Sequence, residues 1–177
     1  LYYDLTEKGW ELVDKSRHHI GDWQEKIRHR VGVARTKVYL EKEDYSDNPP
    51  EAVRDVVDVD TYHSVYEAPA VYDLVGYDES GEAALVVEVE CNSNNASAVR
   101  EDYQKLSEAN VEAMWIAEKM ETIKHISRSL ASLDEVPDDI KWSRFNNVKK
   151  FRQWVAEQDL EGMEAINTFT GIKEDPS

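Results

Sequence analysis

Residues 85–95 read LVVEVECNSNN, and the fold that we expect depends on this stretch. Its apolar residues predict a strand that is buried between neighbouring strands. Within the same run Glu88 and Glu90 lie two residues apart, so a strand would direct both carboxylates to one face of a sheet. The polar segment NSNN at 92–95 predicts a turn in which an Asn or Ser side chain caps the next helix. A nearly buried strand with two carboxylates on one face needs a physical reason.

The segments on either side of this strand predict a mixed sheet. The sequence DESGE at 78–82 predicts a hairpin turn that joins YDLVGY at 72–77 to the central strand. Residues 96–109 then predict a helix, and residues 111–117 predict a short apolar strand. A strand–helix–strand order of this length indicates a parallel pair joined by a right-handed crossover. We therefore expect antiparallel and parallel neighbours in the same sheet.

Other segments are expected to cover this sheet. Residues 21–43 predict a helix with one apolar stripe at helical spacing, formed by Trp23, Ile27, Val31, Ala34 and Val38. Further helices are predicted at 120–133 and 148–158, further β-structure at 52–62 and 64–77, and a loop or an edge strand at 136–145. The expected fold class is α/β, a sandwich in which helices flank a small mixed sheet.

The composition fits one domain of moderate size. The chain has 177 residues, of which 37 are acidic and 21 basic, and its formal net charge is −16. Such a surface is typical of proteins from a high-salt cytoplasm, and it also suits a basic partner or mimicry of DNA. It disfavours sequence-independent DNA binding at low salt but leaves room for a local basic groove.

The compartment is indicated by what the sequence lacks. Cys91 is the single cysteine, so an internal disulfide is excluded. There is no signal-peptide pattern and no apolar run long enough to cross a membrane. We therefore expect a cytoplasmic protein with no membrane partner.

Asp73 lies on the first strand of the expected hairpin, and Glu88 and Glu90 lie on the second. Paired strands are about 5 Å apart, so the three carboxylates can converge at one end of the sheet. At that spacing they repel each other unless they are solvated, protonated or bridged by a divalent cation. Mg²⁺ (or Mn²⁺) suits such a set, and it would assist hydrolysis of a phosphodiester. The alternative is that these residues line an ordinary solvent-facing strand.

The order of Asp, hairpin and Glu-x-Lys is the pattern of the PD-(D/E)xK nucleases, which share the restriction-endonuclease-like fold. This chain resembles that superfamily over residues 21–130, with Asp73 in VYDLVGYD and Glu88 in VVEVE. The resemblance implies a Mg²⁺-dependent DNA endonuclease that leaves 5′-phosphate and 3′-hydroxyl ends. It implies Asp73 and Glu88 as metal ligands. The helices before and after the hairpin would contribute Glu25, Gln104 and Lys105.

Two positions depart from the family pattern. Tyr72 stands where the family has a Pro before the Asp, a change that the family tolerates. The lysine of the motif is replaced by Glu90, which cannot supply positive charge but can bind a second metal ion or act as a base. Lys105, on the next predicted helix, is the candidate for the missing charge. A narrower resemblance to a branch of the fold from archaeal and mobile-element proteins rests on Glu25, His29, Ser93 and Asn94. In that branch Ser93 and Asn94 would face the nucleic acid.

Two other segments are candidates for DNA contacts. The basic residues Lys149, Lys150 and Arg152 belong to a cluster with interleaved aromatic residues, which suits a DNA backbone; a solvated helix with an aromatic core face is the alternative. Residues 1–17 resemble the last wing strand and following helix of winged-helix proteins, although a plain N-terminal helix fits equally well. We therefore expect a winged-helix-like segment at 1–17 and a nuclease-like domain at 18–170.

Three functions stay open at this point. The first is a metal-dependent DNA endonuclease, with DNA as its partner. The second is a catalytically degenerate module of the same fold that serves DNA binding or protein docking in a viral or mobile-element protein; Glu90 and the acidic surface favour it. The third is a transcriptional regulator, which rests on residues 1–17 alone. A homodimer is an open alternative because many nucleases of this fold act as dimers.

Overall fold

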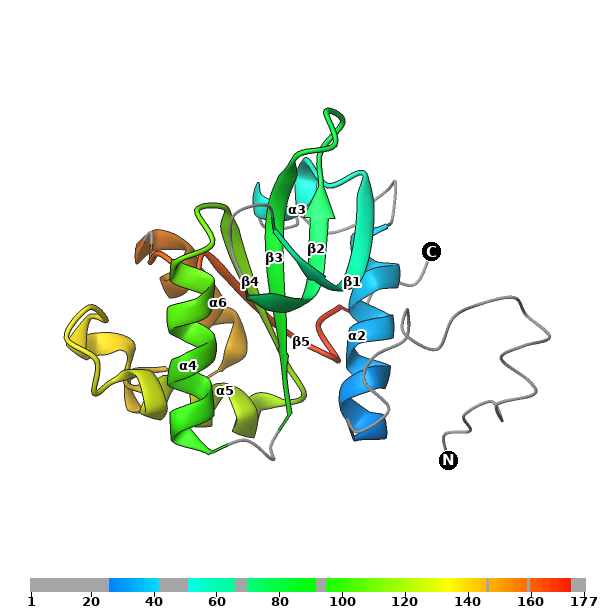
Figure 1. Cartoon of the computed structure of the whole chain (residues 1–177). Helices are drawn as coiled ribbons and strands as arrows, with labels where there is room; N and C mark the ends of the chain where they lie inside the picture. The colour runs from blue at the N-terminus through cyan, green and yellow to red at the C-terminus, as the bar shows by residue number, and fades with distance from the viewer. Residues whose placement is uncertain are drawn as a thin grey trace.

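The structure is a computed structural model that describes residues 26–41, 51–65, 70–91, 95–145, 147–158 and 160–172. Its centre is a five-stranded mixed sheet with helices on both faces (Figure 1), which confirms the expected α/β class. The strands are β1 (Asp58–Ser64), β2 (Val71–Tyr77), β3 (Ala83–Glu90), β4 (Glu112–Ala117) and β5 (Ala165–Thr168). The α-helices are α2 (Ile27–Leu40), α3 (Glu51–Arg54), α4 (Ala96–Ser107), α5 (Met120–Leu130) and α6 (Val148–Gln158).

The sheet has the strand order β1-β2-β3-β4-β5, which is also the order along the chain. Strands β1, β2 and β3 are antiparallel neighbours, and β3, β4 and β5 are parallel neighbours. The hairpin turn is confirmed: Asp78 Oδ1 accepts the Ser80 and Glu82 N–H groups at 2.8 and 3.1 Å, and Gly81 has a positive φ of 80°. The crossover from β3 through α4 to a parallel β4 is confirmed as well.

The predicted helix cap lies at the end of the NSNN turn. Asn95 precedes α4, and its Oδ1 accepts the N–H groups of Ser97 and Ala98 at 2.9 and 3.0 Å. These bonds satisfy two of the donors that the first turn of a helix leaves open. The cap therefore fixes the point at which the chain turns from β3 into α4.

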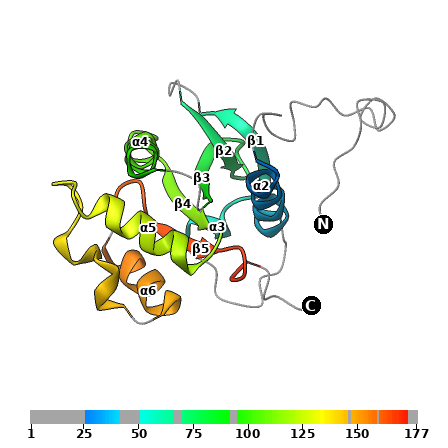
Figure 2. The ribbon, with the colours of Figure 1, turned by 90° about the horizontal axis from the view of Figure 1, so that it is seen from below.

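Two apolar layers enclose the sheet, and Figure 2 shows α4, α5 and α6 on one side of it and α2 on the other. Along β3, Val86 packs in the layer with α4, whereas Val87 and Val89 pack in the layer with α2. Because side chains alternate along a strand, Glu88 and Glu90 share the α4 side with Val86. This confirms that the two carboxylates point to one face, which the helices cover rather than leave open to solvent.

Helix α2 packs with a different face from the one that its sequence predicted. The apolar stripe points away from the sheet, since Ile27 is 42% exposed and Val38 is 64% exposed; Trp23 is outside the described residues. The packed face is instead formed by Gly32, Val33, Thr36, Tyr39 and Leu40. Gly32 and Thr36 favour this packed face, because their small side chains let the helix approach the sheet more closely than the branched side chains of the stripe would.

Other boundaries differ from the prediction as well. The β-structure expected from residue 52 begins at Asp58, because Glu51–Arg54 form the short helix α3, whose Val53 is buried between α3 and the sheet. The second predicted strand is described as β only over Val71–Tyr77. The potential edge strand at 136–145 is wrong: two 3₁₀ helices occupy Asp138–Ile140 and Trp142–Arg144. Strand β5 was not predicted.

Close packing at Gly32 gives a first testable prediction. A Cβ at this position would lie 2.2 Å from Phe169 Cζ and 2.7 Å from Val89 Cγ1, so both partners would have to move. We expect Gly32→Val to lower the free energy of unfolding by about 3 kcal/mol, measured by urea denaturation. The matched control is Ala34→Val on the exposed side of α2, with an expected change of less than about 0.7 kcal/mol. Equal losses in both variants would contradict this seating of α2.

Candidate functional site

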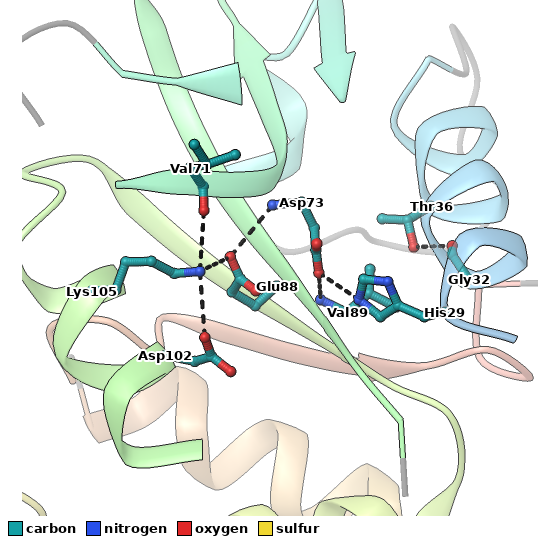
Figure 3. Close-up of polar contacts among 9 residues, drawn as sticks. All are labelled: His29, Gly32, Thr36, Val71, Asp73, Glu88, Val89, Asp102 and Lys105. Atoms are coloured by element: carbon teal, nitrogen blue, oxygen red, sulfur yellow. Dashed lines mark hydrogen bonds and ion pairs between the residues drawn. The ribbon is translucent and has the colours of Figure 1, made fainter. Parts of the chain in front are cut away.

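The regular pairing between β2 and β3 ends where the carboxylates begin. Leu74 and Val87 form the last paired positions, and beyond them side-chain oxygens accept the main-chain donors. Asp73 Oδ2 accepts the Val89 N–H at 2.8 Å, and Glu88 Oε1 accepts the Asp73 N–H at 3.4 Å (Figure 3). Because a buried N–H without a partner is costly, these bonds hold both carboxylates in place. Asp73 and Glu88 therefore meet at the point where the two strands separate.

Helices from opposite faces of the sheet supply a partner to each carboxylate. From α2, His29 Nε2 lies 3.0 Å from Asp73 Oδ2. From α4, Lys105 Nζ lies 2.5 Å from Glu88 Oε1. The same ammonium group is 3.3 Å from the Val71 carbonyl oxygen. Figure 3 shows Asp73 and Glu88 side by side between the two helices. The structure thus brings together Asp73, Glu88, His29 and Lys105, which the sequence had singled out separately.

Asp102 and Tyr72 complete the surroundings of Lys105, and the sequence analysis did not assign them a role. Asp102 Oδ1 lies 3.4 Å from Lys105 Nζ, one helical turn away on α4. The Tyr72 hydroxyl donates to the Lys105 carbonyl oxygen at 3.2 Å, and Lys105 Nζ is 5.5 Å from the centre of the Tyr72 ring. The i, i+3 spacing of Asp102 and Lys105 is a signal that could have identified the first of these contacts.

The charges of this cluster do not balance, and the pKa values reflect it. Burial raises the pKa of Glu88 well above its usual value; the charge of Asp73 adds to the rise, and Lys105 opposes it. Burial lowers the pKa of Lys105, but the charge and hydrogen bond of Glu88 outweigh this, and the net change is upward. Burial also raises the pKa of Asp102, against the effect of Lys105. The cluster therefore favours an additional positive charge, either a proton or a cation.

Comparison with family models, curated proteins and solved structures returned no match. The function of the chain is therefore argued from the contacts described above. Among the described residues, no helix is long and apolar enough to cross a membrane.

A set of three ligands is not assembled within the described part of the chain, where no group of three or more His, Cys, Asp and Glu side chains is arranged to hold a metal ion. Glu90 lies one step further along β3 than Glu88 and is 1% exposed, and its carbonyl oxygen accepts the Glu118 N–H at 2.8 Å. Asp73 and Glu88 are the two carboxylates that meet where β2 and β3 separate. The contacts above occupy Oδ2 of Asp73 and Oε1 of Glu88, which leaves Oδ1 and Oε2 as donors of the hard type that Mg²⁺ prefers.

The remaining predicted site residues do not join this cluster. Glu25, Ser93 and Asn94 lie outside the described residues. Gln104 Nε2 donates to Glu108 Oε1 at 3.1 Å along the exposed side of α4.

The predicted DNA-binding residues Lys149, Lys150 and Arg152 belong to α6. This helix is separated from α4 by α5 (Figure 2), so the structure does not bring the three residues to the carboxylates. The aromatic residues of this region pack on one another, with ring centres 5.1 to 6.0 Å apart for Phe145, Phe151 and Trp154. Their rings therefore serve the core, as the alternative interpretation of this cluster expected.

The thiol of Cys91, just after β3, gives a second prediction. Burial raises its pKa to about 12, and the nearby charges of Glu118, Glu90 and Asp73 add to the effect. Relative to the ordinary pKa of 9.0, the thiolate at neutral pH is reduced about 10³-fold. We expect a thiol reagent such as DTNB to modify the native protein at least about 100-fold more slowly than the urea-unfolded chain. Rapid modification of the native protein would show that Cys91 is accessible and would contradict the packing at this end of β3.

Proposed function

We propose that this chain is a Mg²⁺-dependent DNA endonuclease domain that hydrolyses phosphodiester bonds. The observation that carries the proposal is the meeting of Asp73 and Glu88 at the separation of β2 and β3, with Lys105 at 2.5 Å from Glu88. Two hard carboxylates beside one fixed cation are the donor set that phosphoryl chemistry uses. The resemblance to the PD-(D/E)xK pattern supports the same assignment.

Asp73 and Glu88 would hold the metal ion through Oδ1 and Oε2, the carboxylate oxygens that the contacts described above do not use. When bound, Mg²⁺ would polarise the phosphodiester and lower the pKa of a bound water molecule. Burial raises the pKa of Glu88, and the negative charge of Asp73 adds to the rise; the same negative charge favours a cation at this place. The donor set therefore fits Mg²⁺ or Mn²⁺ on chemical grounds.

The chain's own groups would act around the substrate. Lys105 takes the role of the motif lysine from α4 instead of from β3, and its ammonium group would stabilise negative charge on the phosphate. Its contacts with Val71 and Asp102 hold it in position. His29 would orient Asp73 through their hydrogen bond. Glu90, in the position of the motif lysine, would assist as a base or a further ligand. A cytoplasmic location belongs to the same proposal.

A second candidate function is a degenerate module of the same fold that binds DNA or a protein without cleaving it. The observation in its favour is that both carboxylates already have basic partners, His29 for Asp73 and Lys105 for Glu88. In this alternative the cluster would stabilise the separated strands and have no catalytic role. The two functions differ in whether DNA is cleaved.

A plasmid cleavage assay with Glu88→Gln tests the proposal. Supercoiled DNA is incubated with the protein and Mg²⁺ or Mn²⁺, with EDTA as the blank. We expect nicked and linear products from the wild type, with ends that DNA ligase can rejoin, and a loss of about 10³-fold in rate for Glu88→Gln. The matched control is Glu101→Gln on the exposed side of α4, which should cleave like the wild type. Absence of cleavage by the wild type with either metal would favour the degenerate module.

A further inference from the structure

Helix α2 differs in charge from the other α-helices in the described part of the chain. Its 14 residues include Arg28, Arg30, Arg35 and Lys37 and no acidic residue. Each of the other α-helices in the described ranges carries at least one Asp or Glu. In a chain with a net charge of −16, a helix of this kind is the place to which an anionic polymer is directed.

This basic helix adjoins the candidate site. His29 contacts Asp73, so α2 runs directly past the carboxylates (Figure 3). The neighbouring Arg28 reaches the carboxyl edge of the parallel strands, where its Nη1 is 3.2 Å from Glu118 Oε1. Glu118 follows β4 and donates its N–H to Glu90 at the end of β3. Arg28 therefore lies at the edge of the sheet where β3 and β4 end.

Arg28 and Arg35 form one row along α2. They are seven residues apart, so they project from nearly the same side of the helix, about 10 Å from each other along its axis. The Arg28 side chain is 70% exposed. Lys37 projects from the opposite flank, where its Nζ donates to the Val59 carbonyl oxygen and pairs with Glu41. We call Arg28 and Arg35 the α2 arginine row.

We propose that the α2 arginine row binds backbone phosphates of the DNA that Asp73 and Glu88 would act on. The choice of DNA rests on the proposed function. A guanidinium group binds a phosphate through two parallel hydrogen bonds. The Arg28 side chain is 70% exposed and the Glu118 side chain is 17% exposed, so the guanidinium group of Arg28 can meet a phosphate from the solvent side of this pair. In this proposal the α2 arginine row is the DNA-binding surface, in place of Lys149, Lys150 and Arg152 on α6.

The test is fluorescence anisotropy with a short labelled DNA duplex in EDTA, so that binding is measured without cleavage. Three double variants each remove two positive charges: Arg28→Ala/Arg35→Ala on α2, Lys149→Ala/Lys150→Ala on α6, and Lys124→Ala/Arg128→Ala on α5 as the control. We expect the α2 variant to bind roughly tenfold more weakly and its dependence of log K on log salt to fall by about 2, because two phosphate contacts are lost. Circular dichroism melts verify that each variant is folded.

The outcomes separate this inference from the proposed function. DNA binding that depends on the row without any cleavage would support the row and favour the degenerate module. Cleavage by a protein whose binding does not depend on the row would support the endonuclease and overturn the inference. A loss confined to the α6 variant, equal losses in the α2 and α5 variants, or no binding by the wild type would each overturn it too.

Discussion

Asp73→Asn is expected to abolish the proposed Mg²⁺ binding and to lower the rate of the proposed DNA cleavage by about 10³-fold or more, because a neutral amide replaces the carboxylate that we propose as a metal ligand. The fold should tolerate the change. An Asn carbonyl oxygen can still accept the Val89 N–H that Asp73 Oδ2 accepts at 2.8 Å, and the loss of one charge relieves repulsion with Glu88. We therefore expect the free energy of unfolding to change by no more than about 1 kcal/mol.

Calorimetric titration of Mg²⁺ and Mn²⁺ into the wild type and into Asp73→Asn measures this effect directly. Asp60→Asn, on the exposed side of the edge strand β1, is the matched control and should bind like the wild type. Heat that saturates for the wild type and the control but not for Asp73→Asn would place the ion at Asp73. Equal titration curves for all three proteins would remove Asp73 from the proposed ligand set.

Lys105→Met is expected to be the most destabilising single change in the cluster. It leaves Glu88 buried without its 2.5 Å ion-pair partner. Loss of one member of a buried pair costs about 3–5 kcal/mol, and we expect about 2–3 kcal/mol because Lys105 retains some exposure to solvent. The proposed cleavage should fall by about 10²-fold in addition, since Lys105 is the positive charge that we propose to stabilise the phosphate.

The pH dependence of this loss has a definite sign. The pKa of Glu88 in the folded protein lies above its ordinary value of 4.5, so the folded state binds more protons than the unfolded chain between these two values. Stability therefore falls as the pH rises through this interval. Lys105 opposes the rise of the Glu88 pKa, so its removal raises that pKa further. The pH interval over which stability falls becomes wider, and the total loss of stability becomes larger. The variant should be closest to the wild type in acid and furthest from it above neutral pH.

Urea denaturation of the wild type and Lys105→Met at about pH 5 and about pH 8 measures the loss of stability and its dependence on pH. The double variant Glu88→Gln/Lys105→Met removes both charges, so it should recover much of the stability and show a weaker pH dependence than Lys105→Met. If Lys105→Met were as stable as the wild type at both pH values, the short contact between Lys105 and Glu88 would not contribute to folding.

The sequence was sufficient for the centre of the fold because its signals there are local. The hairpin turn depends on Asp78 and Gly81 in five consecutive residues, and the cap of α4 depends on Asn95. The packed face of α2 could not be predicted in the same way. It uses Gly32 and Thr36, whose hydroxyl donates to the Gly32 carbonyl oxygen, and a hydrophobic pattern gives such small residues little weight. Strand β5 has only four residues, one of them Asn167, which is too short a pattern for prediction.

For the site, the positions of Asp73 and Glu88 follow from the hairpin register, and the role of α4 follows from its place after β3. The contacts of Arg28 with Glu118 and of His29 with Asp73 join residues 90 and 44 positions apart. Such distant pairs depend on how α2 is seated against the sheet, and nothing in the local sequence encodes that seating. The basic residues Arg28 and Arg35 lie beside the apolar stripe in the sequence of α2, so their exposure depends on the same seating.

The sheet order, in which each strand lies beside its neighbour in the chain, has a consequence for folding. Strands β1 to β3 form a meander in which short connections join neighbouring strands. Strands β3 and β4 pair only after the chain has closed the longer connection that contains α4. Contacts that close short loops form early, and those that need long ones form later. The amide pairs of the β2–β3 hairpin should therefore gain protection from hydrogen exchange first during refolding. The ion pair of Glu88 with Lys105 spans 17 residues and would follow, whereas the contact of His29 with Asp73 spans 44 residues and would form later. The domain would therefore complete its site only when α2 docks on the sheet.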